Sequence, residues 1–239
     1  MRALCISDIH GNLLALTAIL ATAERRSFSK LLIAGDIVFP GGNEDAVTQP
    51  LETWRRLVAA GAVMVQGVTD QALATLDPNH IEANSDHERR MVDRMKRVRS
   101  ELGDVVLERL QRLPKTFRMN LEDGGELVLV HGSPMDPSEA ITFDMSDEEV
   151  LALIGDDPAD VIVCGMSHTP FDRTVSEVRI IGLGSVGEAP DGVSPRELPQ
   201  VAHATWIESS PSGVTVEQIV VPLDFPMTEP RAVSGAPAR

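Results

Sequence analysis

The stretch Ile6-Ser7-Asp8-Ile9-His10-Gly11-Asn12 decides the fold, because it joins a short apolar run to a segment with helical periodicity. Residues 2–6 are mostly apolar and predict a buried strand, whereas residues 13–26 place leucines at helical spacing. Asp8 and His10 therefore lie where a strand ends and a helix begins, which is where open α/β sheets place ligand sites. In extended backbone the two side chains would point the same way and could bind one metal ion. The short motif is also compatible with a helix-capping turn beside an unrelated histidine.

The composition limits the class of protein. The chain has 239 residues, of which 43% are hydrophobic, enough for one large domain or two small ones. No segment approaches an apolar membrane span, and the first strand begins at once, so we expect neither a membrane partner nor a signal peptide. Cys5 and Cys164 lie in apolar runs, which is typical of buried thiols in a reducing compartment and predicts a cytoplasmic protein. A net charge of -15 and the absence of tyrosine argue against a nucleic-acid scaffold.

Strands and helices alternate through the first third of the chain. Residues 30–34 and 62–66 predict buried strands with a helix between them, which indicates parallel βαβ units. Residues 77–114 depart from this pattern as an excursion of two successive helices, the first ending at Gly103. Residues 84–102 carry many arginines beside an apolar face, which is typical of a solvated, charge-paired surface. The alternative for this basic helix is a positive lid beside an acidic site.

The second half of the chain predicts a further set of strands. Glu122-Asp123-Gly124-Gly125 has the composition of a hairpin turn, and Ser146 opens a helix with a capping box. One domain would span residues 1–224, followed by a poorly ordered tail over 225–239 that is rich in proline and alanine. The last three strands are expected to be antiparallel. The predicted strands are 116–120, 126–130, 161–164, 175–181, 202–207 and 214–221.

Candidate ligand residues follow five of the predicted strands. Each is preceded by an apolar run and followed by a glycine, a turn or a helix, and histidines scattered through a core would not all fall at strand ends. A single such residue is ordinarily a buried or surface side chain, so the interpretation depends on the whole set. The set comprises Asp8 and His10, Asp36, Thr69 and Asp70, His131, and His168.

The order of these motifs resembles that of a known family. D-x-H, G-D, G-x-x-D, V-H-G-S-P, G-x-x-H and G-S-V-G follow one another over about residues 1–221, as they do in the calcineurin-like metallophosphoesterases. The similarity is greatest to the small bacterial phosphodiesterase branch. The resemblance implies an α/β fold, a four-layer αββα sandwich of two mixed sheets flanked by helices, which agrees with the elements predicted above.

The resemblance also implies two metal ions bridged by Asp36. The first ion would be held by Asp8, His10, Asp36 and His168, all of which are present. This set predicts one tightly bound divalent transition metal, which would be manganese, iron, zinc or nickel, with open positions for water and phosphate.

The second ion would retain fewer of the implied ligands. Asp36 and His131 are present, but the positions of the other two ligands hold Val68 and Met166. Valine has no donor atom, and a thioether suits copper(I) rather than manganese, iron or zinc in an oxygen-rich site. Thr69 stands where the family usually has a histidine that helps to bind and protonate the leaving group. We therefore expect one complete metal site and a second, partly degenerate one.

Two further departures concern the binding of phosphate. Met135 stands where related sequences often carry an arginine. Glu188-Ala189 replace a polar and basic pair after the last glycine motif. Both changes would remove contacts to a phosphate group.

The activity implied by the resemblance is hydrolysis of a phosphodiester or a small nucleotide-like phosphate by a metal-bound hydroxide, and it would be weaker with a single metal. Asp36 and His131 are the expected catalytic residues. Asn12, at a helix N-terminus, and Thr69 are expected to contact the substrate. The alternative is a catalytically degenerate relative that acts as a binding or scaffold module, as does the phosphoesterase-like subunit of the eukaryotic retromer complex. A homo-oligomer is compatible with either function.

Overall fold

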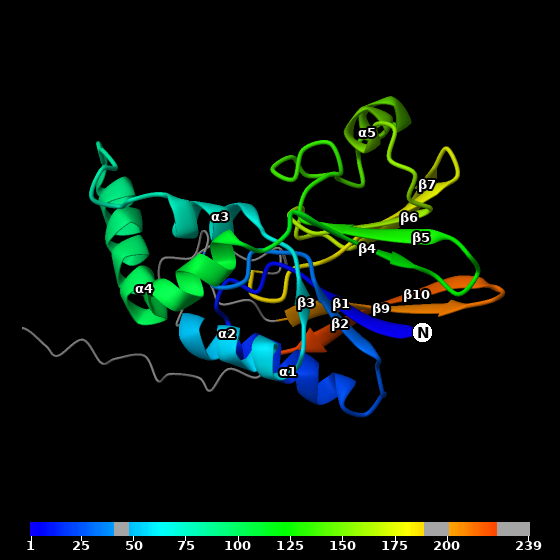
Figure 1. The fold of residues 1–239 in the computed structure, drawn as a ribbon, viewed down its shortest axis with the longest axis horizontal. Helices are drawn as coiled ribbons and strands as arrows, with labels where there is room; N and C mark the ends of the chain where they lie inside the picture. The colour runs from blue at the N-terminus through cyan, green and yellow to red at the C-terminus, as the bar shows by residue number, and fades with distance from the viewer. Residues whose placement is uncertain (41–47, 189–200, 224–239) are drawn as a thin grey trace, which may run out of the picture.

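Two five-stranded sheets face each other, with helices on their outer sides (Figure 1). This computed structural model describes residues 1–40, 48–188 and 201–223, so the predicted tail over 225–239 lies outside the described residues. The predicted α/β sandwich of two mixed sheets is confirmed.

The first sheet joins parallel strands to an antiparallel hairpin. β9 pairs antiparallel with both β1 and β10, whereas β1, β2 and β3 run parallel. The third predicted strand is shorter than residues 62–66, because the amide of Gln66 leaves the sheet and donates to the carbonyl of Pro114 (2.8 Å). In order across the sheet, the strands are β10 (Gly213–Pro222), β9 (Val201–Ser210), β1 (Arg2–Ile6), β2 (Lys30–Ile33) and β3 (Val63–Met64).

The second sheet has a parallel centre and antiparallel edges. The prediction of one strand over 175–181 is wrong, because β7 and β8 form a hairpin that turns at Ser176 and Glu177. These residues have φ of 46° and 71°, a conformation that usually needs asparagine or glycine, so no turn was evident from the sequence. In order across the sheet, the strands are β4 (Thr116–Asn120), β5 (Glu126–Val130), β6 (Val161–Cys164), β8 (Val178–Gly182) and β7 (Phe171–Val175).

Alternation along β1 divides the core into layers. Leu4 packs on the outer side with the buried faces of α1 (Leu13–Ala23) and α2 (Pro50–Ala59). Ala3 and Cys5 point the other way, into a cluster built from both sheets. Since side chains alternate across a strand, one short apolar segment contributes to both layers. Figure 1 shows both helices below the first sheet.

The outer face of the second sheet packs against α5 (Asp147–Ile154), which completes the four layers (Figure 1). The predicted capping box is present, with the Ser146 hydroxyl accepting from the amide of Glu149 (3.3 Å). Cys5 and Cys164 are buried and free, as predicted. Burial, together with the charge of a nearby aspartate, raises the pKa of the Cys164 thiol to about 12.

The predicted helical excursion over 77–114 corresponds to α4 (Asp86–Gln111), which packs against α3 (Val68–Thr75). Gly103, with φ of 71°, interrupts the helical backbone of α4 at the predicted boundary. Arg89 forms an ion pair with Asp86 (2.6 Å), which is the kind of contact that the charge-paired interpretation predicts. Within the described residues, no helix combines the length and the apolar character needed to cross a membrane.

Candidate metal centre

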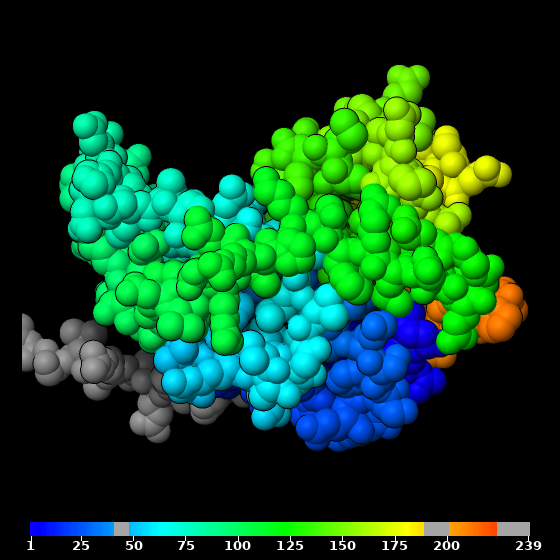
Figure 2. All heavy atoms as spheres, in the orientation of Figure 1, coloured from blue at the N-terminus to red at the C-terminus, as the bar shows by residue number. Residues whose placement is uncertain are grey.

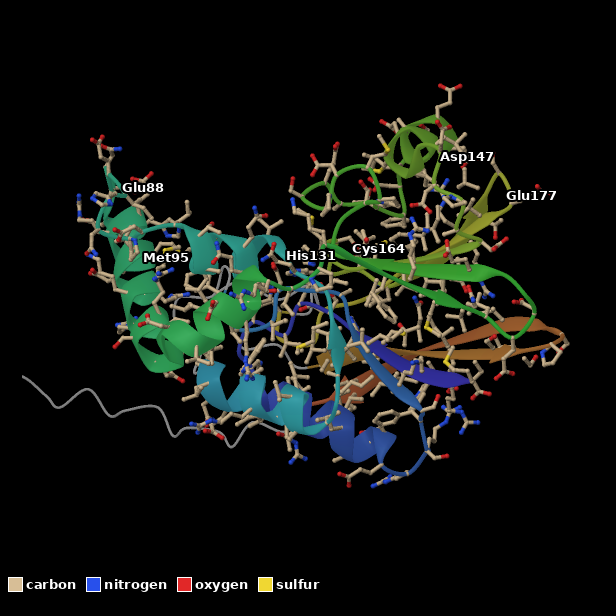
Figure 3. The ribbon with its side chains drawn as sticks, viewed as in Figure 1. Glu88, Met95, His131, Asp147, Cys164 and Glu177 are labelled. Carbon is tan, nitrogen blue, oxygen red and sulfur yellow. The ribbon has the colours of Figure 1, made fainter. Side chains whose placement is uncertain are left out.

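The loops that follow β1, β2, β5 and β6 meet at one end of the two sheets. The amide of Asp8 donates to the carbonyl of Gly35 (3.1 Å), and the amide of Gly165 donates to the carbonyl of His131 (2.9 Å). Figure 3 shows His131 at this end of β5, toward α3. Strands from both sheets therefore bring the predicted ligands to one place.

Four of the predicted ligands have left-handed backbone conformations. A non-glycine residue in this conformation costs about 1 kcal/mol or more, so the surrounding fold must hold the strain. The expectation that Asp8 and His10 point the same way in extended backbone is therefore wrong, and two left-handed turns bring their side chains together instead. The values of φ are 55° at Asp8, 51° at His10, 50° at Asp36 and 58° at His168.

Asp8, His10 and His168 bring three ligand atoms together, and we call this group the outer cluster. Oδ1 of Asp8 lies 3.2 Å from Nε2 of His168 and 3.9 Å from Nε2 of His10. Nδ1 of His10 donates to the carbonyl of Phe39 (2.8 Å), so the lone pair of Nε2 faces the cluster. The Asp8 side chain is fully buried, whereas that of His168 is 26% exposed, so this cluster reaches the surface.

The inner cluster consists of Asp8, Asp36 and His131, all of which are buried. Nε2 of His131 lies 3.4 Å from Oδ2 of Asp36, and Nδ1 of the same ring donates to the carbonyl of Ala34 (2.6 Å). The backbone amide of Thr69 donates to Oδ1 of Asp36 (2.9 Å). Each of these side chains is thus anchored on one side and presents a ligand atom on the other. Asp8 belongs to both clusters, whereas the resemblance implies Asp36 as the bridge.

Several ligand atoms are buried without a hydrogen-bond partner, namely Oδ1 of Asp8, Nε2 of His10 and Nε2 of His131. A buried polar group without a partner costs about 1–3 kcal/mol, so this arrangement is expensive unless something else binds these atoms. A divalent cation would satisfy them. Imidazole nitrogen combined with carboxylate oxygen suits manganese, iron, nickel or zinc, so the residues present fit the metal that the resemblance implies.

The charges in the centre alter the pKa values of its side chains. Burial alone would raise the pKa of Asp36, but the adjacent His131 and its positive charge outweigh burial and lower that pKa. Burial alone would lower the pKa of His131, yet the adjacent Asp36 carboxylate raises it to about 9. Without a cation, the His131 imidazole therefore holds a proton at neutral pH, and a cation that binds this ring must displace the proton.

Asp70 joins the start of α3 to the loop after β2. Its Oδ2 accepts from the amide of Gly67 (3.0 Å) and its Oδ1 from the amide of Ile37 (3.0 Å), so it caps the start of α3. Burial and the charge of Asp36 raise the pKa of Asp70 to about 6. Only glycine fits at position 67, since a Cβ there would lie 2.1 Å from Oδ1 of Asp36. Among the described residues, Asp70 is part of neither cluster.

The two residues predicted to contact the substrate, Asn12 and Thr69, differ in the hydrogen bonds of their side chains. Oδ1 of Asn12 accepts from the amide of Ala15 (3.0 Å) and caps α1, and its side-chain nitrogen donates to the carbonyl of Gly187 (3.4 Å). The hydroxyl oxygen of Thr69 is buried without a hydrogen-bond partner. The side chain of Asn12 is thus engaged within the protein, whereas the hydroxyl of Thr69 forms no hydrogen bond among the described residues.

The departures from the family pattern that the structure describes add no side chain to either cluster. Val68, the first residue of α3, is 37% exposed. Met166 contributes its backbone amide, which donates to Oδ2 of Asp8 (3.1 Å). Met135 is 63% exposed, and its backbone amide donates to the carbonyl of Leu153 (3.1 Å). These positions therefore support the chain locally rather than completing the inner cluster.

Two residues of the site were not predicted from the sequence. The Ser185 hydroxyl donates to the carbonyl of Asp8 (2.9 Å) and accepts from the amide of Glu188 (2.7 Å). Oε2 of Glu188 lies 3.9 Å from Nε2 of His10. The G-S-V-G motif was the available signal, but sequence spacing does not show that this segment returns to the end of β1.

The surface is hollowed between the segment that begins α4 and the part of the chain that carries α5, as Figure 2 shows. α3 lies between these two parts of the molecule (Figure 1). Its first turn contacts Asp36 through the amide of Thr69. A ligand bound in this depression would therefore lie next to α3 and the part of the metal centre that α3 contacts.

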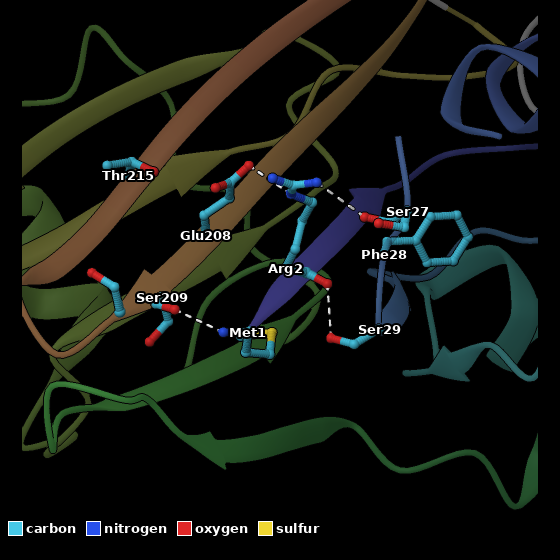
Figure 4. A pocket seen from close by; sticks show the side chains of 9 residues that line it. Met1, Arg2, Ser27, Phe28, Ser29, Glu208, Ser209 and Thr215 are labelled. Carbon is cyan, nitrogen blue, oxygen red and sulfur yellow. Dashed lines mark hydrogen bonds and ion pairs between the residues drawn. The ribbon is translucent and has the colours of Figure 1, made fainter. Parts of the chain in front are cut away.

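A separate pocket of about 590 Å³ lies at the opposite end of β1 (Figure 4). Arg2 pairs there with Glu208 (2.7 Å), and the Ser29 hydroxyl donates to the carbonyl of Arg2 (3.0 Å). These polar groups bind one another, and neither cluster borders the pocket. We assign it no role in the chemistry of the centre.

The fold and the two clusters define a class of protein: two mixed sheets that carry a candidate dinuclear metal centre at their strand ends. Residues 1–202 match the calcineurin-like phosphoesterase superfamily domain. The chain belongs to this superfamily, as its motifs suggested. Members of the superfamily use divalent metals, and membership indicates hydrolase activity.

Solved structures support the same fold. A hypothetical protein from Pyrococcus horikoshii OT3 has a TM-score of 0.72 and 23% identity, over 93% of this chain and 88% of that one. A metallophosphoesterase from Sphaerobacter thermophilus has a TM-score of 0.66 and 22% identity, over 92% and 88%. The phosphoesterase Yfce from E. coli has a TM-score of 0.51 and 19% identity, over 94% and 100%. A comparison with curated proteins gave no match.

Proposed function

We propose that the protein is a metal-dependent phosphoesterase that hydrolyses a phosphodiester or a small nucleotide-like phosphate. The observation that carries this proposal is the convergence of unsatisfied, buried atoms of Asp8, His10 and His131 at the strand ends of a calcineurin-like phosphoesterase. The donor set favours a divalent transition metal, and we propose manganese as the first metal to test.

The side chains of the centre have distinct roles in this proposal. A divalent cation, when bound, would polarise the phosphate and make a coordinated water more acidic. Asp8, His10 and His168 would hold and orient that cation. Nε2 of His131 faces Asp36 and, while the inner cluster is empty, can carry a proton to the leaving oxygen. The hydroxyl of Thr69 would bind a phosphate oxygen, and the capped helix at Asn12 would add positive potential.

We also propose that the two clusters are unequal. The inner cluster offers three protein side chains, and neither Val68 nor Met166 adds another. A single cation in the outer cluster would keep the reaction possible, but its rate would fall because a second Lewis acid is missing.

A second candidate function is a binding or scaffold module. It is favoured by the exposed apolar side chains of Val68 and Met135, at positions where the resemblance implies polar groups. In that case the protein would bind metal without turning over a phosphodiester. The free, buried cysteines support our further proposal of a cytoplasmic protein, and its oligomeric state is a separate measurement.

Metal content and hydrolysis of bis(p-nitrophenyl) phosphate test the proposed function together. Asp8→Asn removes the carboxylate shared by both clusters, and we expect metal content to fall with a loss of rate of about 100-fold or more. Asp156→Asn changes an exposed aspartate and should leave both quantities unaltered. Metal binding without manganese-dependent hydrolysis in the wild type would favour the scaffold function. A wild-type chain that binds no divalent metal would contradict both the centre and the proposed enzyme.

A further inference from the structure

The segment that carries Glu188 is fixed against the end of β1. Ser185 pairs with Ser7 in an isolated parallel bridge, and the amide of Gly187 donates to the carbonyl of Asp8 (2.9 Å). A Cβ at Gly187 would lie 2.1 Å from the carbonyl oxygen of Ile9, so the two backbones approach as closely as glycine permits. The backbone of Glu188 is therefore held at a set position relative to the first ligand of the centre.

Ser185 strengthens this attachment through its hydroxyl group. It donates to the carbonyl of Asp8 (2.9 Å) and accepts from the amide of Glu188 (2.7 Å). Ser185 is fully buried, so this pair of hydrogen bonds is shielded from water. The same serine thus connects the backbone of the shared ligand Asp8 to that of Glu188.

The Glu188 side chain points toward the outer cluster. Its Oε2 lies 3.9 Å from Nε2 of His10, the same separation as that between Nε2 of His10 and Oδ1 of Asp8. The Glu188 side chain is 18% exposed, so its carboxylate lies at the edge of the centre rather than out in solvent. Nε2 of His10, the atom that both carboxylates face, has no hydrogen-bond partner.

These separations match those of atoms that share one ion. Two ligand atoms at about 2.1 Å from the same cation can be at most about 4.2 Å apart. The distances from His10 to Asp8 and to Glu188 are both 3.9 Å, and that from His168 to Asp8 is 3.2 Å, so all three pairs meet the limit. Glu188 is not within the compact group formed by the other three residues, so its flexible side chain would have to move toward the cation.

We propose that Glu188 is a fourth ligand of the cation in the outer cluster, beside Asp8, His10 and His168. The proposal rests on the proposed function only in that a cation must bind there. Two carboxylates and two neutral imidazoles would balance the charge of a divalent ion. Glu188 thus has a defined chemical use at a position where the sequence suggested only a lost phosphate contact.

Manganese binding to the full, chelator-stripped chain tests the proposal. We expect Glu188→Gln to weaken manganese binding at the tightest site by about tenfold or more. Loss of a ligand should lower the affinity at least as much as loss of a residue that only orients a ligand. The visible spectrum of bound cobalt(II), which depends on the number and type of ligands, should also change. Glu188→Asp, which keeps a carboxylate on a shorter side chain, should recover part of the affinity. Glu148→Gln, a change at an exposed glutamate of α5, is the matched control and should behave as the wild type does.

The outcomes separate this proposal from the proposed function. If Glu188→Gln binds manganese as tightly as the wild type and gives the same cobalt spectrum, Glu188 is not a ligand. If Asp8→Asn abolishes binding in the same experiment, the centre itself stands and only the role of Glu188 is overturned. If hydrolysis rises in Glu188→Gln while metal affinity is unchanged, the carboxylate repels phosphate instead. Absence of manganese binding in the wild type would overturn both proposals.

Discussion

The outer and inner clusters share Asp8 but differ in what surrounds them. His168 gives the outer cluster contact with solvent, whereas Asp36 and His131 in the inner cluster are buried. Glu188 lies beside the outer cluster at 3.9 Å from His10. The inner cluster instead adjoins α3, whose backbone amide at Thr69 binds Asp36.

This difference shows where substitutions can alter the centre without destroying it. The buried ligand His131 is held by the backbone carbonyl of Ala34 and by the carboxylate of Asp36. Removal of His131 would therefore leave the charge of Asp36 unpaired. The positions of Val68 and Met166 lie at the periphery, where a side chain can change without disturbing a strand. Loss of ligands at the periphery would lower the affinity for a second cation while the fold and the first cation are retained.

The largest expected effect separates Asp36 from its neighbour Asp70. Asp36→Asn should reduce both metal content and phosphodiester hydrolysis, by about 100-fold for the rate, because Asp36 is a ligand of the inner cluster and its carboxylate orients His131, the proposed proton donor. Asp70→Asn should reduce the rate by less than about tenfold. It should instead lower stability by about 1–3 kcal/mol, since an amide group cannot accept from both backbone amides.

Metal analysis, hydrolysis and thermal unfolding of both variants make this comparison. A larger loss of metal in Asp70→Asn than in Asp36→Asn would reverse the assignment of ligand and helix cap. Loss of the tightly bound cation in Asp36→Asn would show that Asp36 bridges both clusters, as the family resemblance implies.

A second experiment tests the inner cluster by adding ligands to it instead of removing one. Val68→Asn and Met166→His together would add a carbonyl oxygen and an imidazole nitrogen beside Asp36 and His131. We expect the double variant to bind a second manganese and to hydrolyse an aryl phosphodiester about tenfold faster or more. Each single variant should gain little, because each lacks one ligand, so the effects should be strongly non-additive.

The two single variants serve as controls for the double variant. Added manganese should raise its melting temperature by mass action, which separates a rebuilt site from a polar group that only disturbs packing. A double variant that binds two metals yet gains no activity would show that the missing metal does not limit turnover. The scaffold function would then be the better account.

A smaller effect is expected for the folding stability of the metal-free protein when the pH is varied. The pKa of His131 is raised from 6.5 to about 9 in the folded state, so its pairing with Asp36 contributes stability fully below pH 6.5. This contribution is lost as the pH rises through 9, and it amounts to about 3 kcal/mol at most. The lowered pKa of Asp36 acts at the acid end, where stability is lost as the pH falls below 3.8 toward the lowered value.

Thermal unfolding of the chelator-treated chain between pH 6.5 and 9.5 measures this contribution. The melting temperature of the wild type should fall by several degrees relative to that of His131→Asn, in which the titrating group is absent. Equal slopes in the two proteins would mean that the ion pair of His131 and Asp36 does not form in the metal-free state.

Most of the fold was accessible from the sequence because the buried strands are continuous apolar runs. Leu127, Val128 and Leu129 are fully buried, and such runs are typical of strands covered on both faces. The candidate ligands were accessible for a related reason, since His131 follows such a run directly and Asp8 follows one after a single serine. Parallel strands bring their carboxyl ends to one edge, so the order of the motifs was enough to group them.

The remaining features depend on contacts between distant segments. The left-handed backbone of Asp8 and His168 is imposed by neighbouring loops, and aspartate and histidine give no strong local signal for it. The hairpin at Ser176 was missed for the same reason. Glu188 reaches His10 only because residues 185–187 return to the end of β1, a pairing that no local periodicity encodes.

The number of manganese ions bound by the metal-free chain tests the inequality of the two clusters most directly. Free manganese would be followed by electron paramagnetic resonance while the chelator-stripped, full-length protein is titrated. We predict one tightly bound equivalent in the outer cluster and a second that binds at least about tenfold more weakly, because the inner cluster lacks further ligands at Val68 and Met166. Two equivalents of equal affinity would contradict the account, since the inner cluster would then be complete without them.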